Sequence, residues 1–141
     1  WNKDFDKVKN WCNEYNGAIL PSSNFSLGVN IFFEINKQLS KIMNRQKSYS
    51  AKIRETHHTE KVDSPSGTAI TTAEIILEEM DHYSNWVSNT SNYGNKLPII
   101  AKRQEGVAGT HQVIYESNID ELSISHRAKN RDGFAIGAIN R

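Results

Sequence analysis

The sequence predicts an α+β domain, a mixed β-sheet with helices packed on one of its faces. Long segments in the first part of the chain carry apolar residues every three to four positions, which is the period of an amphipathic helix. Strand-like segments dominate the second part, and one of them alternates between apolar and polar residues. The chain has no internal repeat and no low-complexity segment. A layer of helices on one face of a sheet is the economical way to bury both apolar patterns.

Four segments have helical patterns. Residues 5–15 have helical spacing, and Gly17 fits a C-terminal cap. A long amphipathic helix is expected from Ser26 onward. Its apolar residues are Leu27, Ile31, Phe32, Ile35, Leu39, Ile42 and Met43. Ser66 is a good N-cap for the next helix. The apolar stripe of that helix consists of Ala69, Ile70, Ala73, Ile76, Leu77 and Met80. A last apolar helical pattern begins at Gly133.

Strands are expected in five places. Residues 18–21 are predicted as a short strand that Pro21 ends, and a second strand covers roughly residues 49–56. Three more are predicted over residues 97–102, 111–117 and 121–128. Residues 118–120 would form the turn that makes the last two an antiparallel hairpin. The polar segment 81–96 is predicted as a loop or a short helix.

The composition is that of an ordinary soluble domain. Of 141 residues, 37% are hydrophobic and 23% are charged, which supports one modest core. The net charge of +1 provides no bulk attraction for nucleic acid or a membrane surface, so we expect neither as a partner. No apolar run approaches the roughly 18 residues of a membrane span. The single cysteine, Cys12, favours a reducing compartment, and we expect a cytoplasmic protein.

Reactive side chains are concentrated in residues 55–69. His57 and His58 stand at the end of a predicted strand, and Lys61 follows four residues after His57. An imidazole exchanges protons near neutral pH, and a nearby cation lowers its pKa. We expect one histidine to act as a general acid and the other to hold an anionic substrate, with Lys61 as a second cation aimed at the same anion. The alternative is a group of solvated polar residues at a strand end.

Other interpretations of the charged groups stay open from the sequence. A zinc site would need a third ligand, which only folding could bring from Asp63, His111 or His126. The usual spacings of zinc ligands are absent, so we predict no metal. Glu55 and Asp63 either orient the bases or neutralise the local charge. His126 falls on the apolar side of its strand, which is typical of a satisfied core histidine.

The turn formed by Ser66, Gly67 and Thr68 combines two hydroxyls with a glycine that lets the backbone approach a ligand closely. At a helix N-terminus, the free N–H groups and the helix dipole favour a carboxylate or a phosphate. An ordinary N-cap is the alternative. The lysine precedes the glycine instead of following it, which does not fit a P-loop, and there is no G-x-S-x-G elbow for a serine nucleophile.

These residues resemble a known family, 4-hydroxy-tetrahydrodipicolinate reductase, which is also called dihydrodipicolinate reductase. The family signature E-x-H-H-x-x-K-x-D-x-P-S-G-T-A is met at every fixed position of residues 55–69. Residues 24–30 resemble the N-F-S-x-G-V-N helix entrance of the family. Residues 109–111 and 126–135 resemble its C-terminal segments. The resemblance therefore extends in order across nearly the whole chain.

The resemblance implies an activity. The family reduces 4-hydroxy-tetrahydrodipicolinate to tetrahydrodipicolinate in lysine and diaminopimelate biosynthesis, with NADH or NADPH held by an N-terminal Rossmann domain. Its C-terminal α+β domain binds the dicarboxylate substrate and forms a homotetramer through the sheets. Hydride reaches ring C4, and the enzyme protonates the neighbouring carbon.

The resemblance also implies roles by motif position. His57 would be the general acid/base, Lys61 a proton donor and carboxylate partner, and His58 a substrate-binding residue. The residues that would clasp a ring carboxylate are Ser66, Gly67 and Thr68. The residues that would meet the nicotinamide are Ser22, Ser23, Asn24 and Phe25.

The sequence departs from the family pattern because it contains no G-x-G-x-x-G. We expect residues 1–17 to be a remnant of a nucleotide-binding domain. Residues 18–141 would form the substrate-binding, catalytic and tetramerisation domain with a truncated C-terminal helix, inactive without the missing part. A non-enzymatic dicarboxylate-binding or oligomerisation module is the second hypothesis. A zinc hydrolase that uses His57 and His58 is the third.

Overall fold

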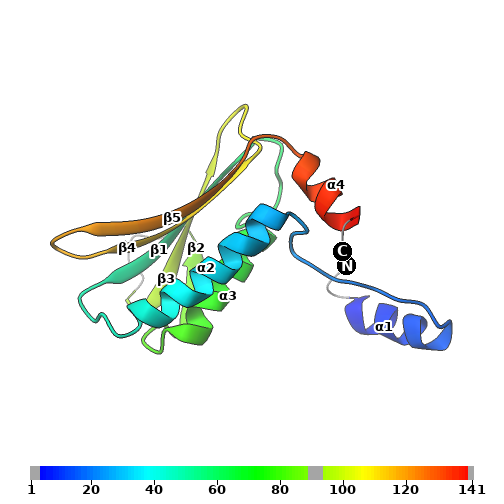
Figure 1. Cartoon of the computed structure of the whole chain (residues 1–141), viewed down its shortest axis with the longest axis horizontal. Coiled ribbons are helices and arrows are strands. Elements are labelled where there is room, and N and C mark those ends of the chain that lie inside the picture. Colours follow the sequence, from blue (N-terminus) through cyan, green and yellow to red (C-terminus); the bar gives the residue numbers. More distant parts are fainter. Residues whose placement is uncertain (1–3, 89–93, 140–141) are drawn as a thin grey trace.

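The computed structural model describes residues 4–88 and 94–139. Its helices are α1 (Phe5–Glu14), α2 (Leu27–Met43), α3 (Gly67–Glu79) and α4 (Asp132–Ile139). Its strands are β1 (Ser50–His57), β2 (Asn85–Ser88), β3 (Lys96–Arg103), β4 (Gly109–Glu116) and β5 (Glu121–Ala128). Figure 1 shows their arrangement along the chain.

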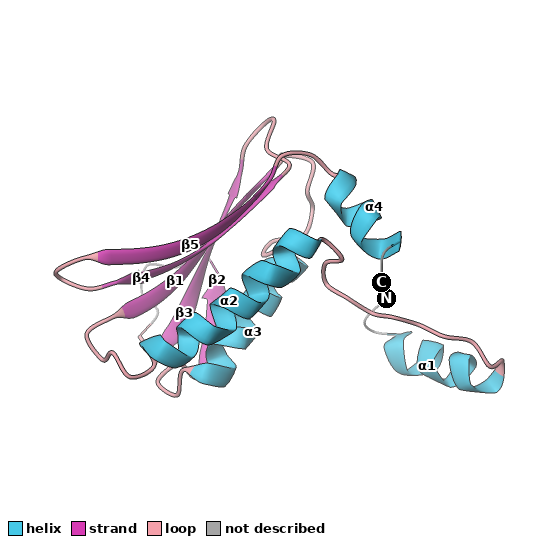
Figure 2. Cartoon of the chain, in the orientation of Figure 1, coloured by secondary structure: helices cyan, strands magenta, loops and turns pink. Residues whose placement is uncertain are grey.

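The strands of the described residues form one mixed sheet in the order β2-β3-β1-β4-β5. At its centre, β1 is parallel to β3 and antiparallel to β4. At the edges, β2 is parallel to β3 and β5 is antiparallel to β4. Helices α2 and α3 lie side by side over one face of the sheet (Figure 2). The α+β class predicted from the sequence is confirmed.

Strand β1 carries reactive groups into the space between the sheet and the helices. Ile53, Glu55 and His57 are buried, whereas Arg54 is exposed. Successive side chains of a strand point to opposite faces, so the core residue Ile53 places Glu55 and His57 on its own face. Because the strand ends at His57, the chain turns at His58 and both imidazoles can reach one pocket.

The core lies between the central strands and the two helices. Ile53 is in register with Ile99 on β3 and Val113 on β4, and none of the three has exposed surface. Other buried core residues include Ile76, Met80 and Leu97. The Tyr115 hydroxyl on β4 forms a hydrogen bond of 2.9 Å with Ser40 Oγ on α2. This bond joins the last turn of the long helix to the sheet near the start of β1.

Most predicted elements are confirmed. The helices predicted over residues 5–15 and from Ser26 onward are α1 and α2. The cap predicted at Ser66 is also present, since its hydroxyl accepts a hydrogen bond of 3.2 Å from the Ala69 amide. Strand β5 covers the predicted residues 121–128 and pairs with β4 as a hairpin.

Two predictions about local structure are wrong. Residues 18–21 form no strand and lie in an exposed connection before α2. None of the described strands pairs with them, and an isolated strand leaves its backbone groups without partners. The segment 81–96 contains strand β2, with Trp86 in register with Leu97 of β3. Residues 89–93 of that segment lie outside the described residues. The pairing of β2 with β3 is a tertiary effect that local polarity does not reveal.

The two terminal helices differ from the rest in their packing. Helix α1 lies away from the sheet and from the pair α2 and α3, and α4 follows β5 and approaches α2 (Figure 1). Among the described helices, none has the length and apolar character needed to cross a membrane. The predicted division of the chain into residues 1–17 and 18–141 stays a prediction.

Truncating the central core residue tests this description. Ile53→Ala should lower the free energy of unfolding by about 2–5 kcal/mol, because it leaves a cavity between β1, its neighbours and the helices. Urea denaturation of the chain measures the change. Ile119→Ala is the matched control, since Ile119 is 92% exposed in the turn between β4 and β5. A similar loss in both variants would contradict the assignment of the core.

Candidate functional site

A pocket of about 620 Å³ opens at the end of β1, beside the starts of α2 and α3. It is lined by all the residues that the sequence singled out for catalysis or binding, namely His57, His58, Lys61, Ser66, Gly67, Thr68, Ser22, Ser23, Asn24 and Phe25. Further lining residues come from β4, β5 and the chain around the start of α4: Gly109, His111, His126, Arg131 and Phe134. The fold therefore brings the predicted residues together, while the role of each stays a prediction.

The start of α3 provides the amides of the pocket. The helix begins at Gly67, directly after its N-cap Ser66, so its first N–H groups have no partner within the helix. A Cβ atom added at Gly67 would meet only Ser23 Cβ, at 4.0 Å, which is ordinary contact. Together with the helix dipole, these amides favour a carboxylate at this end of the pocket.

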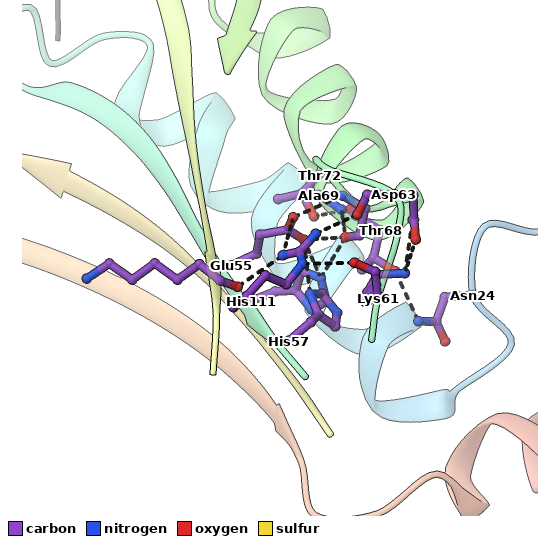
Figure 3. A network of polar contacts seen from close by, with 12 residues as sticks. Asn24, Glu55, His57, Lys61, Asp63, Thr68, Ala69, Thr72 and His111 are labelled. Atoms are coloured by element: carbon purple, nitrogen blue, oxygen red, sulfur yellow. Dashed lines mark hydrogen bonds and ion pairs between the residues drawn. The ribbon is translucent and has the colours of Figure 1, made fainter. Parts of the chain in front are cut away.

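Glu55 lies beneath this helix start as a buried carboxylate (Figure 3). The Ser66 amide donates to its Oε1 at 3.0 Å, and the Ser66 hydroxyl donates to its Oε2. His111 Nε2 lies 3.5 Å from Oε2, and Arg103 Nη1 lies 3.9 Å from Oε1. Both donor groups of Ser66 are therefore directed at Glu55 and away from a pocket ligand.

These contacts keep Glu55 ionised. Burial alone would raise the pKa of Glu55, but hydrogen bonds from His111 and Ser66 lower that pKa to about 2. The sequence left open whether Glu55 orients a base or neutralises charge. In the structure Glu55 contacts the helix cap Ser66, Arg103 of β3 and His111 of β4, and whether it orients a base stays open.

His57 is held between Glu55 and His111. Its Nδ1 lies 3.4 Å from Glu55 Oε2, and its ring meets that of His111 edge-on, with centroids 4.9 Å apart. Burial is the largest cause that lowers the pKa of His57 to about 4, and His111 and Lys61 act in the same direction. Glu55 opposes this shift. With a pKa of about 4, His57 is a neutral imidazole at pH 7, and it becomes a strong proton donor once protonated.

Lys61 supplies the cation expected from the sequence. Its Nζ donates to both carboxylate oxygens of Asp63, at 2.7 and 2.9 Å. Burial acts to raise the pKa of Asp63, but the hydrogen bond from Lys61 outweighs it and lowers that pKa. The Asp63 side chain is 57% exposed, so an anionic ligand could replace it at the ammonium group. His58 is half-buried nearby, with Nδ1 3.9 Å from Glu60.

The segment before α2 is attached to the start of α3. Asn24 Nδ2 donates to Thr68 Oγ1 at 3.1 Å, and the Thr71 hydroxyl donates to Ser23 Oγ at 2.9 Å. Asn24 Oδ1 accepts from the Ser26 amide at 2.9 Å, which supports the entrance of α2. Residues predicted to meet a nicotinamide thus lie beside residues predicted to clasp a carboxylate.

Sequence reasoning missed three contributors to the site. Arg103 received no role from the sequence and His111 was considered only as a third zinc ligand, although both lie beside Glu55. His126 was expected to be a satisfied core histidine, and this is wrong. It is half-buried in the pocket wall, and its Nδ1 has no hydrogen-bond partner among the described residues. The sequence signals for His111 were its possible place as a third zinc ligand and the resemblance of residues 109–111 to a C-terminal segment of the family.

Glu55, His57 and His111 also resemble a set of metal ligands. Each offers one ligand atom, and these atoms lie within 4.8 Å of one another. However, Ser66 already donates twice to Glu55, and the cations of Arg103 and Lys61 stand close to the group. Glu55 therefore already has hydrogen-bond donors and a nearby cation, and the absence of a metal stays a prediction.

Comparison with known proteins agrees with this picture. The family described as "Dihydrodipicolinate reductase, C-terminus" matches residues 28–141. The 4-hydroxy-tetrahydrodipicolinate reductase of Christiangramia forsetii is 48% identical over 139 residues, which cover 99% of this chain and 58% of that protein. The enzyme of the same name from Methanopyrus kandleri is 37% identical over 122 residues, covering 84% of this chain and 44% of that protein. The chain therefore spans about half the length of the curated relatives it matches.

A solved structure has the same fold. It is the dipicolinate-bound dihydrodipicolinate reductase from Paenisporosarcina sp. TG-14, with a TM-score of 0.66 and 23% sequence identity. The match covers 82% of this chain and 45% of that one. At this level of identity the similarity shows the fold alone.

Acid should destabilise the chain through His57. Its pKa is about 6.5 in an unfolded chain and about 4 in the folded one. Between these values the unfolded chain binds a proton that the folded chain does not, so the free energy of unfolding rises with pH across this window. His57→Gln removes the titrating group and should make the dependence shallower. Chemical denaturation at a series of pH values measures the slope, and an unchanged slope would contradict the burial of a neutral imidazole.

Proposed function

Because the chain belongs to the family of dihydrodipicolinate reductase C-terminal domains, we propose that the whole protein reduces 4-hydroxy-tetrahydrodipicolinate to tetrahydrodipicolinate, with NADH or NADPH as the reductant. This would place it in lysine and diaminopimelate biosynthesis, in the cytoplasm. The observation that carries the proposal is the convergence of Lys61, two imidazoles and the free amides of α3 on one pocket.

The pocket suits a cyclic dicarboxylate. One carboxylate would lie at the start of α3, where the amides of Gly67 and Thr68 are free of helix partners. Lys61 would exchange its exposed partner Asp63 for a substrate carboxylate, with His58 as a further contact. Ser66 supports this arrangement indirectly, because its hydroxyl and amide bond Glu55.

Proton transfer is assigned to His57. A bound dianion beside the imidazole favours the charged form, so it would raise the pKa of His57 above its value of about 4. The protonated ring could then deliver its proton to the ring carbon next to C4. Lys61 affects the same imidazole electrostatically, and by motif position it would be a second proton donor, with solvent restoring the proton. The imidazole would therefore be protonated, and able to act as a general acid, only when the substrate is bound.

The residues before α2 fit a nicotinamide. Ser22, Ser23, Asn24 and Phe25 line the pocket that contains His57, and the bond between Asn24 and Thr68 keeps this segment next to the proposed carboxylate position. When bound, a reduced nicotinamide supplies the hydride to C4. The sequence has no G-x-G-x-x-G. We therefore propose that the phosphates of the dinucleotide bind in a region of the whole protein that corresponds to the additional length of the relatives.

Assembly through the sheet is part of the proposal. Helices cover one face of the sheet, whereas the edge strand β5 exposes Ser123, Ser125 and Arg127 on the other face. We propose that the whole protein is a homotetramer in which sheets meet, with no nucleic acid or membrane as partner. Sedimentation of the whole protein measures the oligomeric state.

The direct test is substrate-dependent oxidation of NADH or NADPH by the whole protein. Pyridine-2,6-dicarboxylate, a planar diacid, should compete with the substrate and bind to the pocket. Binding of the diacid without any reduction of substrate would favour the alternative, a non-enzymatic dicarboxylate-binding module. Failure to bind the diacid would contradict both.

Removing the proton-transfer group should leave binding largely intact. In the whole protein, His57→Gln should lower turnover by roughly two to four decades, the usual contribution of a general acid. Steady-state kinetics with saturating cofactor measures the change. Unchanged turnover would refute the role of His57.

Removing the cation should affect both affinity and turnover. Lys61→Ala deletes a charge aimed at the carboxylate, so KM for the dicarboxylate should rise by at least about tenfold while turnover falls. Lys37→Ala is the matched control, because Lys37 lies on α2 and pairs with Glu79 on the outer side of the helices. If both lysine variants behave alike, Lys61 is an ordinary surface residue.

A further inference from the structure

Arg103 ties the loop that carries Lys61 to the sheet. It is the last residue of β3 and is in register with His57. Its Nε donates to the Lys61 carbonyl at 3.1 Å, and its Nη2 donates to the Asp63 carbonyl at 2.6 Å. A guanidinium is rigid and planar, so two such bonds define both the position and the direction of this loop.

Glu55 connects the same Arg103 guanidinium to the start of α3. Its Oε1 lies 3.9 Å from Arg103 Nη1 and accepts the Ser66 amide at 3.0 Å. Ser66 is the N-cap of α3, so the carboxylate also sets where the free amides of Gly67 and Thr68 point. Figure 3 shows Glu55 between the histidines and the start of α3, with Lys61 and Asp63 nearby.

The two charged residues therefore lie between two separate binding elements. One is the loop with the Lys61 ammonium, and the other is the amide group at the start of α3. A rigid diacid needs both at a constant separation, because its two carboxylates cannot move independently. Neither Glu55 nor Arg103 lines the pocket, so neither is placed to touch the ligand itself.

We propose that Glu55 and Arg103 form a positioning pair that keeps the Lys61 loop and the amides of α3 at the spacing of a dicarboxylate. The inference rests on the proposed function and deepens it, because it assigns the geometric selectivity for a diacid to residues outside the pocket. Arg103 acts through the carbonyls of Lys61 and Asp63, and Glu55 acts through Ser66.

A purely structural ion pair would behave differently. Its loss would lower the stability of the fold and the amount of active protein, but the folded fraction would keep its KM. A positioning pair acts on the ligand-binding geometry, so its loss raises KM for the dicarboxylate more than it lowers kcat. The ratio of the two effects therefore distinguishes the two roles.

The first variant is Arg103→Lys in the whole protein. An ammonium keeps the positive charge near Glu55 but cannot donate to two carbonyls in fixed directions. We expect KM for the dicarboxylate, and the Kd of pyridine-2,6-dicarboxylate, to rise by at least about tenfold, with a smaller change in kcat. Arg54→Lys is the control, because Arg54 is on the same strand as Glu55 and faces solvent on the opposite side of the sheet.

The second variant is Glu55→Gln, which keeps the shape of the side chain and removes its charge. Alone it should raise KM in the same way, since the hydrogen bonds from Ser66 and the ion pair with Arg103 weaken. Combined with Arg103→Lys, it should add little, because residues that act as one unit are not additive. If Glu55→Gln does not fold, Arg103→Lys still tests the inference by the ratio of KM to kcat.

The outcomes separate this inference from the proposed function. A parent protein that neither reduces the substrate nor binds the diacid would overturn the function and the inference together. An active parent whose KM changes less than twofold in Arg103→Lys would overturn the positioning pair alone. A double variant whose effect on KM is the full product of the two single effects would also overturn it.

Discussion

The ionised carboxylate of Glu55, buried between the sheet and the start of α3, is the interaction on which the rest of the site depends. A buried charge is stable only when hydrogen bonds and opposite charges replace the lost water. Here the replacements come from Ser66 on α3, His111 on β4 and Arg103 on β3. Burial acts to raise the pKa, yet the net result is a pKa of about 2. The groups that stabilise the Glu55 charge therefore connect α3, β3 and β4 to β1 beside the pocket.

The two acids of the motif have opposite environments, and this difference organises the charges of the pocket. Glu55 is buried and bonded from several sides, so it belongs to the framework. Asp63 is largely exposed and bonded to Lys61, so it neutralises the ammonium at the surface. His57 stays neutral in between, because burial outweighs the attraction of Glu55. The pocket therefore combines a neutral imidazole with an ammonium group whose carboxylate partner is exposed.

Local sequence patterns predicted the elements that depend on local physics. The alternation of residues 121–128 predicted β5, and the hydroxyl of Ser66 before an apolar stripe predicted the cap of α3. Predictions failed where pairing decides the outcome. The apolar residues 18–21 have no strand beside them among the described residues, whereas Trp86 lies in a polar segment but pairs with β3. Strand formation requires partners for the backbone, and a single segment does not specify its partner.

The sequence by itself determined that the candidate site residues lie near one another. His57, Lys61 and the Ser66–Thr68 turn fall within twelve residues, at the end of one strand and the start of one helix. Only the tertiary structure decided what surrounds them. The register of β1 with β4 places His111 opposite Glu55, and its register with β3 places Arg103 beside His57. The hydroxyl of Ser66 donates to Glu55, because a buried carboxylate without hydrogen-bond donors would cost more free energy than an exposed one. Such preferences arise from burial, which exists only after the sheet and the helices have come together.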